Sequence, residues 1–272
     1  MSISNQDFEY LRNFLKTSSG LVVNPEKEYL LKSRLEPLAR SQGMDSIGEL
    51  VSSMKKFSSS DLKVEVTDAM TTNESLFFRD KTPFEHLDNI MLPYLLDARK
   101  SRKRIKIWCA AASTGQEPYS IAMSLKEKSA MVAGWKFDIL GTDISKSVLQ
   151  KASVGHYTQF EVQRGLPIKL LLKYFKQEGE NWVLNEDIRK MVTYKEGNLL
   201  ENFTNIGRFD IVFCRNVLIY FDLDTKREVL NKIAMQMEKD AYLLLGAAET
   251  VMGVCDKFEA VKGSRGLYKL VK

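Results

Sequence analysis

Most of the polar residues in this sequence that could form a functional site follow apolar runs in its carboxyl-terminal two thirds. The first such segment is the small-residue loop CAAASTGQE, residues 109–117, which ends in an acid. Its alanines and Gly115 let the backbone turn closely past a ligand before a helix begins near Pro118. The loop lacks the GxGxxG pattern of dinucleotide-binding turns, and the carboxylate of Glu117 suits a ligand with ammonium and sulfonium charges. A plain strand-to-helix turn is the competing interpretation.

Further polar residues follow the next apolar runs. Asp143 ends the second run, and a carboxylate at that point of an α/β sheet commonly accepts two hydrogen bonds from ribose. The alternative is that Asp143 caps the helix that begins near Lys146, a task that Ser145 could do equally well. Arg215 and Asn216 directly follow a buried run, where polar side chains need a partner.

Two more segments complete the candidate site. Residues 196–200, EGNLL, follow the third run, and the backbone there with Asn198 could lie along a flat adenine ring. Residues 71–80, TTNESLFFRD, alternate polar side chains with Phe77 and Phe78. This segment predicts an interdomain linker that buries its aromatic side chains.

The elements that position these residues fall into two regions. Residues 1 to about 70 show only helical patterns: residues 7–18, a helix after Asn24-Pro25 that Pro37 bends or ends early, and shorter helices at 46–56 and 61–70. From residue 105, apolar runs alternate with helical patterns, which is typical of βαβ units in a parallel sheet. The expected strands are 105–109, 136–142, 191–194, 209–214 and 241–246, and the expected helices are 117–128, 146–153, 167–175 and 224–237. Residues 258–261 and 267–271 predict an antiparallel hairpin at one edge of the sheet.

Composition limits the chemistry. Only two histidines are present, His86 and His156, and the three cysteines are far apart, so a Ser-His-Asp triad, a zinc site and a disulfide framework are disfavoured. No run of about eighteen apolar residues and no signal-like amino terminus occur, so we expect a cytoplasmic protein without membrane insertion. The formal charge of +5 fits an acidic partner. We interpret the basic run at 99–104 as a solvated helix end, and expect no nucleic acid, because no aromatic residues interleave it.

Five segments together resemble the chemotaxis-receptor glutamate methyltransferase (CheR) family: TTNESLFFRD, ASTGQEPYSIA, GTDIS, GNLL and FCRNVLIYF. They occur in this order and at fitting separations, and the resemblance covers essentially the whole chain. It implies an α/β fold in which a class I (Rossmann-like) methyltransferase sheet has an antiparallel edge hairpin, follows a small all-α amino-terminal domain and carries a small β-subdomain at about 174–194. The implied domains are a receptor-recognition domain over 1–70 and an S-adenosylmethionine-binding methyltransferase domain over 71–272, with a linker at about 71–85.

The resemblance also assigns residues. The implied cofactor is S-adenosylmethionine, with S-adenosylhomocysteine as its product and no metal. Contacts to it are implied for Asn73, Ser75, Arg79, Glu117, Asp143, Asn198, Leu199, Cys214, Arg215 and Asn216. Ser75 stands where a threonine is expected and keeps the hydroxyl, whereas Gln116 stands where an acid is common. Arg79 and Tyr220 match residues near the methyl-transfer centre. The receptor-binding side chains are implied to be Lys27, Lys32, Arg34 and Arg40.

The implied function is methylation of glutamate γ-carboxylates in the cytoplasmic domain of methyl-accepting chemotaxis receptors, for sensory adaptation. A glutamate has a pKa of about 4.3, so it is already an anion and a nucleophile, and the scarcity of histidine fits a reaction without a general base. We expect Arg79 to hold the acceptor carboxylate by charge-assisted hydrogen bonds and Tyr220 to steer it in line. We also expect a monomer that does not depend on a receptor peptide tether, because the loop around Gly179 is short and lacks a glycine-rich insertion.

Two other functions remain open from the sequence. A methyltransferase that acts on nucleic acid or on a small molecule would use the same cofactor site. The Asn/Asp-Pro-Pro-Tyr/Phe motif of amino-group methyltransferases is absent, however, since residues 215–218 read RNVL. The second alternative is a non-catalytic scaffold that binds the cofactor product and a receptor. The presence of Arg79, Asp143 and Tyr220 argues against it.

Overall fold

The computed structural model describes residues 3–56, 60–203 and 205–271, and the chain forms two compact units. The first unit is Met1–Thr72 together with Tyr220–Thr225, and the second is Asn73–Ile219 together with Lys226–Lys272. The sequence analysis expected a single boundary near residue 70. The chain therefore returns to the first unit once, for six residues that follow the candidate site segment at 213–219.

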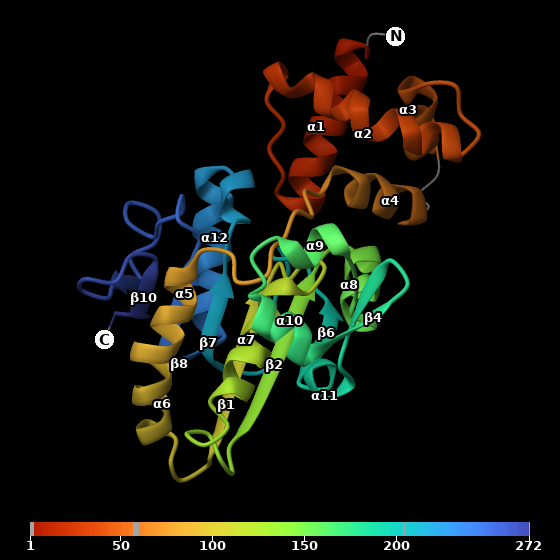
Figure 1. Cartoon of the computed structure of the whole chain (residues 1–272). Coiled ribbons are helices and arrows are strands. Elements are labelled where there is room, and N and C mark those ends of the chain that lie inside the picture. The colour runs from red at the N-terminus through yellow and green to blue at the C-terminus, as the bar shows by residue number, and fades with distance from the viewer. Residues whose placement is uncertain (1–2, 57–59, 204, 272) are drawn as a thin grey trace. The chain divides into compact units, whose positions relative to one another are not determined.

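The first unit is built from helices α1 (Asn5–Ser19), η1 (Pro25–Lys27), α2 (Glu28–Ser41), α3 (Ile47–Lys56) and α4 (Ser60–Met70) (Figure 1). Its core contains leucines at helical spacing, including Leu11, Leu15, Leu31 and Leu35. The expectation that Pro37 bends or ends the second helix early was wrong as to its end, because α2 continues to Ser41. Burial of the flanking Leu35 and Ala39 offsets the backbone hydrogen bond that a proline cannot donate.

The start of the second helix also differs from the expectation. The side chain of Asn24 makes no capping hydrogen bond, and Pro25 begins the 3-10 turn η1, which leads into α2. Proline is favoured in the first turn of such an element because its missing N–H would have no partner there.

Three contacts hold the returning segment within the first unit. The amide of Val22 donates to the carbonyl oxygen of Tyr220 at 3.0 Å, and Lys16 Nζ lies 2.7 Å from Asp222 Oδ2. Gly20 ends α1 with a φ of 78°, and a Cβ atom at this position would lie 3.0 Å from the ring of Phe221. Glycine is thus required here both by the backbone conformation and by the close approach of an aromatic side chain.

The second unit is centred on a seven-stranded sheet with the order β6-β2-β1-β7-β8-β10-β9 (Figure 1). The strands are β1 (Arg104–Ala110), β2 (Lys136–Asp143), β6 (Val192–Glu196), β7 (Phe209–Cys214), β8 (Met237–Leu245), β9 (Phe258–Ala260) and β10 (Leu267–Leu270). The first five strands in this order pair in parallel, whereas β10 pairs antiparallel with both β8 and β9. The predicted Rossmann-like sheet with an antiparallel edge hairpin is confirmed.

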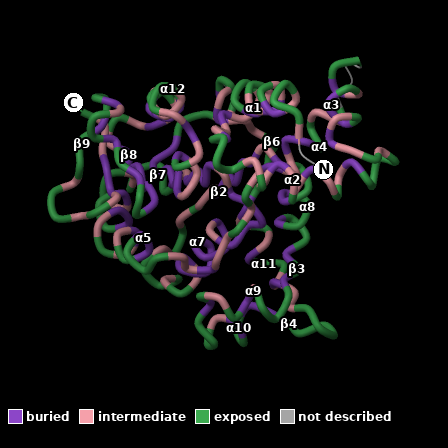
Figure 2. The backbone as a smooth tube through the Cα atoms, turned by 90° about the horizontal axis from the view of Figure 1, so that it is seen from above, coloured by how far each residue is buried: buried purple, intermediate pink, exposed green. Residues whose placement is uncertain are grey.

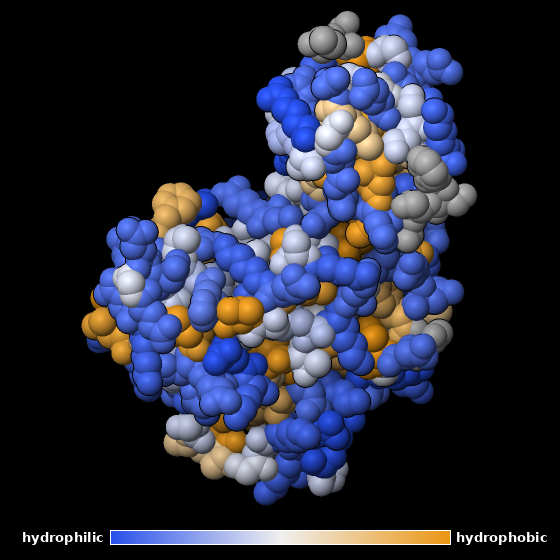
Figure 3. Space-filling model, turned by 90° about the vertical axis from the view of Figure 1, so that its right-hand side faces the viewer, coloured by the Kyte–Doolittle hydropathy of each residue, from blue (hydrophilic) through white to orange (hydrophobic). Residues whose placement is uncertain are grey.

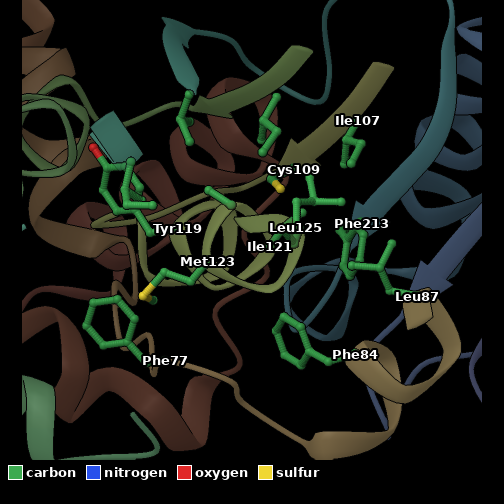
Figure 4. Close-up of a cluster of buried hydrophobic side chains, with 14 of the residues drawn as sticks. Phe77, Phe84, Leu87, Ile107, Cys109, Tyr119, Ile121, Met123, Leu125 and Phe213 are labelled. Carbon is green, nitrogen blue, oxygen red and sulfur yellow. The ribbon is translucent and has the colours of Figure 1, made fainter. Parts of the chain in front are cut away.

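One face of this sheet packs against α7 (Gln116–Glu127) and a helical stretch formed by α5 (Lys81–His86), η2 (Leu87–Met91) and α6 (Leu92–Ala98). Figure 4 shows this core, with side chains from α5 and η2 meeting those of β1, α7 and β7. The sequence analysis did not predict the helical stretch at 81–98. The other helices of this unit are α8 (Lys146–Val154), α9 (Gln159–Gln163), α10 (Ile168–Tyr174), α11 (Glu186–Arg189), η3 (Leu218–Tyr220) and α12 (Leu223–Met235), of which the last two share residues with the first unit.

Strand alternation sends Trp108 of β1 to the opposite face, where its ring lies 4.8 Å from that of Phe203. The crossover from β1 to β2 runs towards one edge and that from β7 to β8 towards the other. Right-handed connections therefore put α7 and α12 on opposite faces. Both faces of the central strands are covered, and β7 is buried at every residue (Figure 2). The continuous apolar runs of the sequence reflect this double burial.

A second, three-stranded sheet has the order β3-β5-β4 and is antiparallel throughout. It consists of β3 (His156–Thr158), β4 (Phe175–Glu178) and β5 (Asn181–Leu184), and residues 179–180 join β4 to β5. This sheet corresponds to the β-subdomain expected at about 174–194. The expected range does not include β3, and its last residues belong to β6 of the main sheet.

Hydrophilic side chains predominate on the face shown in Figure 3, and the apolar ones form small separate patches. None of the helices formed by the described residues combines the length and the apolarity needed to cross a bilayer.

Candidate active site

The candidate site lies where four parallel strands end. Ala110, the last residue of β1, is paired with Thr142 of β2 on one side and with Cys214 of β7 on the other. At the same edge Asp143 of β2 is paired with Glu196 of β6. The loops that follow these strands therefore meet at the carboxyl ends of the strands, which is where ligands bind in open α/β folds.

The loop between β1 and α7 has an unusual backbone. Ala111 and Ser113 have φ values of 61° and 50°, and Gly115 has a φ of 92°. Non-glycine residues avoid positive φ because the Cβ atom clashes with the backbone, so this conformation is held by its surroundings. The amide of Ser113 donates to Asp143 Oδ2 at 2.8 Å, and a Cβ at Gly115 would lie 2.6 Å from the Tyr194 hydroxyl. The loop is fixed in a tight turn at the strand ends.

Asp143 has a defined place between two loops. It is 7% exposed, and its two carboxylate oxygens accept hydrogen bonds from the amides of Ser113 and Ser145. The helix α8 is capped by Ser145, whose hydroxyl oxygen accepts a hydrogen bond from the amide of Val148 at 3.3 Å. The capping role considered for Asp143 therefore belongs to Ser145, and the ribose role stays a prediction.

Arg215 is the buried centre of a charge cluster, the Arg215 cluster, formed with the mostly buried Glu117 and the more exposed Asp80. Its guanidinium donates to Glu117 Oε2 at 2.6 Å, to Asp80 Oδ2 at 2.8 Å and to the carbonyl oxygen of Arg79 at 2.9 Å. The Arg215 side chain is only 3% exposed. Its Nε atom is buried and has no hydrogen-bond partner among the described residues. A buried donor without a partner is costly, which marks this atom as one that a ligand can satisfy.

Glu117 is the second residue of α7, and its side chain is 14% exposed. Burial raises the pKa of its carboxyl group, and the positive charge of Arg215 acts in the opposite direction. Glu117 therefore meets a guanidinium within the protein itself, in addition to any cation that a ligand brings.

The predicted residues on the neighbouring strands follow the same edge. Asn198 Oδ1 accepts a hydrogen bond from the amide of Leu200 at 3.0 Å, which closes the turn after β6, and Leu199 is buried. Cys214 is fully buried, and burial raises the pKa of its thiol.

The segment at 73–80 is fastened to the β1–α7 loop. The hydroxyl of Ser113 donates to the carbonyl oxygen of Asn73 at 2.8 Å, and the amide of Phe78 donates to the hydroxyl of Ser120 at 2.9 Å. The linker was expected to bury both phenylalanines; Phe77 is fully buried, whereas Phe78 is only partly buried. Of the six non-glycine residues with positive φ in the described part of the chain, five lie in these loops. They are Phe78, Asp80, Ala111, Ser113 and Asn216.

The structure thus brings Asn73, Arg79, Glu117, Asp143, Arg215 and Asn216 to one edge of the second unit, with Ser75 on the same segment as Asn73. Tyr220 and the basic residues of α2 and η1 belong to the first unit. Sequence reasoning missed Asp80 and Glu249. Glu249 lies three residues after the predicted strand 241–246. The residues that follow this fifth strand were not considered as site residues, and including them would have found Glu249.

The cluster fits S-adenosylmethionine, the ligand that the resemblance implied. The orphaned Arg215 Nε can donate to a carboxylate, Glu117 can accept from an ammonium, and the loop at 111–115 permits close approach of a ligand. Among the described residues no group of histidines, cysteines and acids could hold a metal ion.

Comparison with known proteins gives matches over the whole chain. The family model "CheR methyltransferase, SAM binding domain" matches residues 73–267, and "CheR methyltransferase, all-alpha domain" matches residues 6–71. The chain is 40% identical to Chemotaxis protein methyltransferase Cher2 of Pseudomonas putida over 271 residues, covering 98% of each chain. It is 41% identical to Chemotaxis protein methyltransferase 1 of Pseudomonas aeruginosa, again over 98% of each chain. It is 39% identical to Chemotaxis protein methyltransferase 1 of Vibrio cholerae, over 99% of this chain and 98% of that one.

Proposed function

This chain belongs to the CheR methyltransferase family, and we propose that it methylates glutamate side chains of a chemotaxis receptor with S-adenosylmethionine as donor. In this reaction a glutamate in the cytoplasmic domain of a methyl-accepting receptor becomes its γ-methyl ester, so the proposed place of action is the cytoplasm. The observation that carries the proposal is the Arg215 cluster, a charged and incompletely satisfied group at the strand ends of a methyltransferase fold.

The residues that would hold the cofactor lie in the loops after the four strands. Arg215 and Glu117 hold the carboxylate and the ammonium of its methionine part, and Asp143 accepts from the ribose hydroxyls. Asn198, Leu199 and Cys214 line the adenine, with Asn216 beside them, and Asn73, Ser75 and Arg79 close the site from the linker. When bound, the cofactor supplies an electrophilic methyl group that its own sulfonium charge activates.

The protein's part in the reaction is to position the acceptor. The glutamate carboxylate is ionised at neutral pH and is already the nucleophile, so no side chain has to remove a proton. In the part of the chain that the structure describes, the guanidinium of Arg79 has one hydrogen bond, of 3.4 Å from Nη1 to the carbonyl oxygen of Glu74, so it is weakly held there. We assign it to holding the acceptor carboxylate, and Tyr220 to steering that group with its hydroxyl.

Arg79 must not hold the acceptor too tightly. The acceptor loses its negative charge as the ester forms, so an arginine that binds the carboxylate strongly stabilises the ground state more than the transition state. A weak, positioning interaction resolves this conflict. Substitution of Arg79 by alanine should therefore abolish most turnover and lower the affinity for S-adenosylhomocysteine much less. Unchanged turnover would remove Arg79 from the active site.

Four basic residues of the first unit are proposed to meet the acidic receptor helix, and their contacts differ. Lys32 and Arg40 have acidic partners one turn earlier in α2, Glu28 and Glu36, at 2.8 and 3.6 Å. Such exposed pairs are weak and exchange readily for other anions. Lys27 is exposed in η1, at the entrance to α2.

Arg34 is already engaged inside the first unit. Its guanidinium donates to the carbonyl oxygens of Met70 and Thr71 at 2.6 and 3.0 Å, and to the Thr72 hydroxyl at 3.0 Å. A receptor carboxylate would have to compete with these three bonds. We therefore place Lys27, Lys32 and Arg40 before Arg34 in the proposed receptor contact.

The proposed receptor interaction does not require a peptide tether. The β4–β5 connection has only two residues, Gly179 and Glu180, and so offers no long loop to clamp an added strand. Receptors with and without their carboxyl-terminal peptide should accordingly be methylated at similar rates.

The decisive assay uses the full chain with tritiated S-adenosylmethionine and membranes that contain chemotaxis receptors. Methyl label that base releases as methanol is expected, because a γ-glutamyl ester is base-labile. Base-stable label on RNA, DNA or a small molecule would replace the proposal with one of the alternative methyltransferases. Binding of S-adenosylhomocysteine without any methyl transfer would favour the scaffold.

A further inference from the structure

Glu249, which lies after β8, binds the backbone amides of the loop that follows β7. Its carboxylate accepts five amide hydrogen bonds of 2.6–3.3 Å. The donors are the amides of Asn216, Val217, Leu218, Ile219 and Gly246. Four of these are consecutive residues of one loop, which we call the 216–219 loop.

Five donors occupy the acceptor capacity of one carboxylate, which offers about four lone-pair directions. Glu249 is 9% exposed, so its charge is balanced mainly by these amide dipoles. A group used in this way has no lone pair left to bind a ligand. Its effect is exerted on the loop, whose four amides all point at one place and cannot satisfy one another.

Gly246, which follows β8, lies so close to the loop that a side chain would not fit between them. A Cβ atom at Gly246 would lie 2.7 Å from Glu249 Oε2 and 2.9 Å from the amide nitrogen of Asn216. Asn216 itself has a φ of 59°, a conformation that costs free energy in a residue with a Cβ. The carboxylate and the glycine together hold Asn216 in this conformation, directly after Arg215.

We propose that Glu249 is a positioning residue for methyl transfer, which fixes the 216–219 loop and through it Arg215 and Asn216, without touching cofactor or acceptor. This inference rests on the proposed function, since it assigns to Glu249 the preorganisation of that site. Misplacement of a site by about 1 Å can cost on the order of 100-fold in rate, which is the size of effect expected from a loosened loop.

The test is Glu249→Gln in the full chain, with Glu259→Gln, at an exposed position of β9, as the matched control. Glutamine keeps the shape but turns an NH₂ group towards amide donors. We expect the variant to fold, kcat with receptor membranes to fall about 100-fold, and hydrogen exchange of the 216–219 amides to rise at least about tenfold. The control should change neither quantity more than about twofold. A residue that only adds global stability would lower the melting temperature and leave kcat of the folded protein unchanged.

A second pair of variants guards against misfolding. Gly246→Ala pushes a methyl group into the carboxylate and the loop, whereas Gly48→Ala adds one where the nearest atoms are 3.7 Å away. Loss of turnover in Gly246→Ala alone supports the proposal. Parental kcat and parental amide protection in folded Glu249→Gln, or parental kcat in Gly246→Ala, would overturn it. Absence of methyl transfer by the parent chain would instead refute the proposed function, and the exchange measurement would still report on the loop.

Discussion

Two arginine–carboxylate clusters lie at opposite ends of the strands of the same sheet. In one of them every side-chain nitrogen of the central arginine donates a hydrogen bond; in the other, one nitrogen has no partner in the described part of the chain. Near the amino-terminal ends of β1 and β7, Arg99 donates to Asp210 and Asp240 through Nε and both terminal nitrogens. Asp210 also accepts from Arg102 at 2.6 Å and from the amide of Lys106 at 2.8 Å. We call this the Arg99 cluster. At the carboxyl ends of the strands, the Arg215 cluster leaves Nε of its arginine without a partner among the described residues.

The comparison teaches how to separate a structural ion cluster from a functional one. Both contain a nearly buried arginine between two acids, so residue type and burial do not distinguish them. Hydrogen-bond completeness does, because an arginine whose side-chain nitrogens all donate within the protein has no nitrogen left to offer a ligand. Interpreting the basic run at 99–104 as solvated was wrong for Arg99, whose side chain is 12% exposed and internally paired.

The largest effect is expected from Arg215→Met, which strikes the incomplete cluster. It leaves Glu117 and Asp80 without their partner and removes the orphaned donor, so affinity for S-adenosylhomocysteine should fall on the order of 100-fold or more. Isothermal titration calorimetry measures this, with exposed Arg208→Met as the control. Parental affinity in the Arg215 variant would break the comparison, because the cluster would then be structural.

Arg99→Met tests the complete cluster. It leaves the fully buried Asp210 with fewer partners, and we expect the free energy of unfolding to fall by about 3 kcal/mol. Affinity for S-adenosylhomocysteine should stay within about twofold of the parent at a temperature where the variant is folded. Denaturant titration and calorimetry on the same preparation give both numbers. A large loss of affinity in the folded variant would contradict the assignment of this cluster to stability.

Asp143→Asn tests a carboxylate that lies at the same strand ends as the Arg215 cluster and accepts hydrogen bonds from backbone amides. The amide keeps one acceptor for the neighbouring backbone but loses the charge that strengthens bonds to ribose hydroxyls. About tenfold weaker binding of S-adenosylhomocysteine is expected, which corresponds to about 1.4 kcal/mol. A matched titration with 2′-deoxyadenosine analogues should show a smaller difference between variant and parent. An equal loss for both ligands would place Asp143 away from the ribose.

The smallest effect is expected where an ion pair is exposed. Lys16 lowers the pKa of the Asp222 carboxyl group by a side-chain hydrogen bond, helped by the amide and hydroxyl of Thr225. A carboxylate with a lowered pKa in the folded state stabilises the protein above its unfolded pKa of about 3.9, and this stabilisation is lost as the pH falls. Asp222→Asn should cost about 0.5 kcal/mol at pH 7, with the difference vanishing in acid. Urea titrations across pH would contradict this if the cost grew on acidification.

The sheet was predictable because its strands are buried on both faces and read as apolar runs. The helical stretch at 81–98 was not, since Pro83 and Pro93 look like helix breakers in a sequence. Pro83 stands in the first turn of α5, where proline is tolerated, whereas Pro93 lies inside the stretch, just after the π-helical turn η2 that interrupts the regular hydrogen-bond ladder. The first residues of β8 were also missed, because Glu238, Lys239 and Asp240 are charged and so do not form part of an apolar run.

The candidate site was predictable to the extent that strand ends announce it. Glu117, Asp143 and Arg215 follow apolar runs, and parallel strands bring such residues to one edge. The pairing of Arg215 with Asp80 and the five bonds of Glu249 depend on where loops cross in space, which residue spacing does not encode. Likewise, the resemblance could not show that Arg34 binds the carbonyl oxygens at the end of α4.

The return of Tyr220–Thr225 to the first unit limits how this chain can be cut and recombined. A chimera that exchanges residues 1–72 with a relative would separate Gly20 and Lys16 from Phe221 and Asp222, with which they fit as a matched set. Such an exchange should succeed only when it carries both stretches. Residues 1–72 and 220–225 therefore have to be exchanged together, so an active chimera needs one breakpoint near residue 72 and two more around residues 220–225.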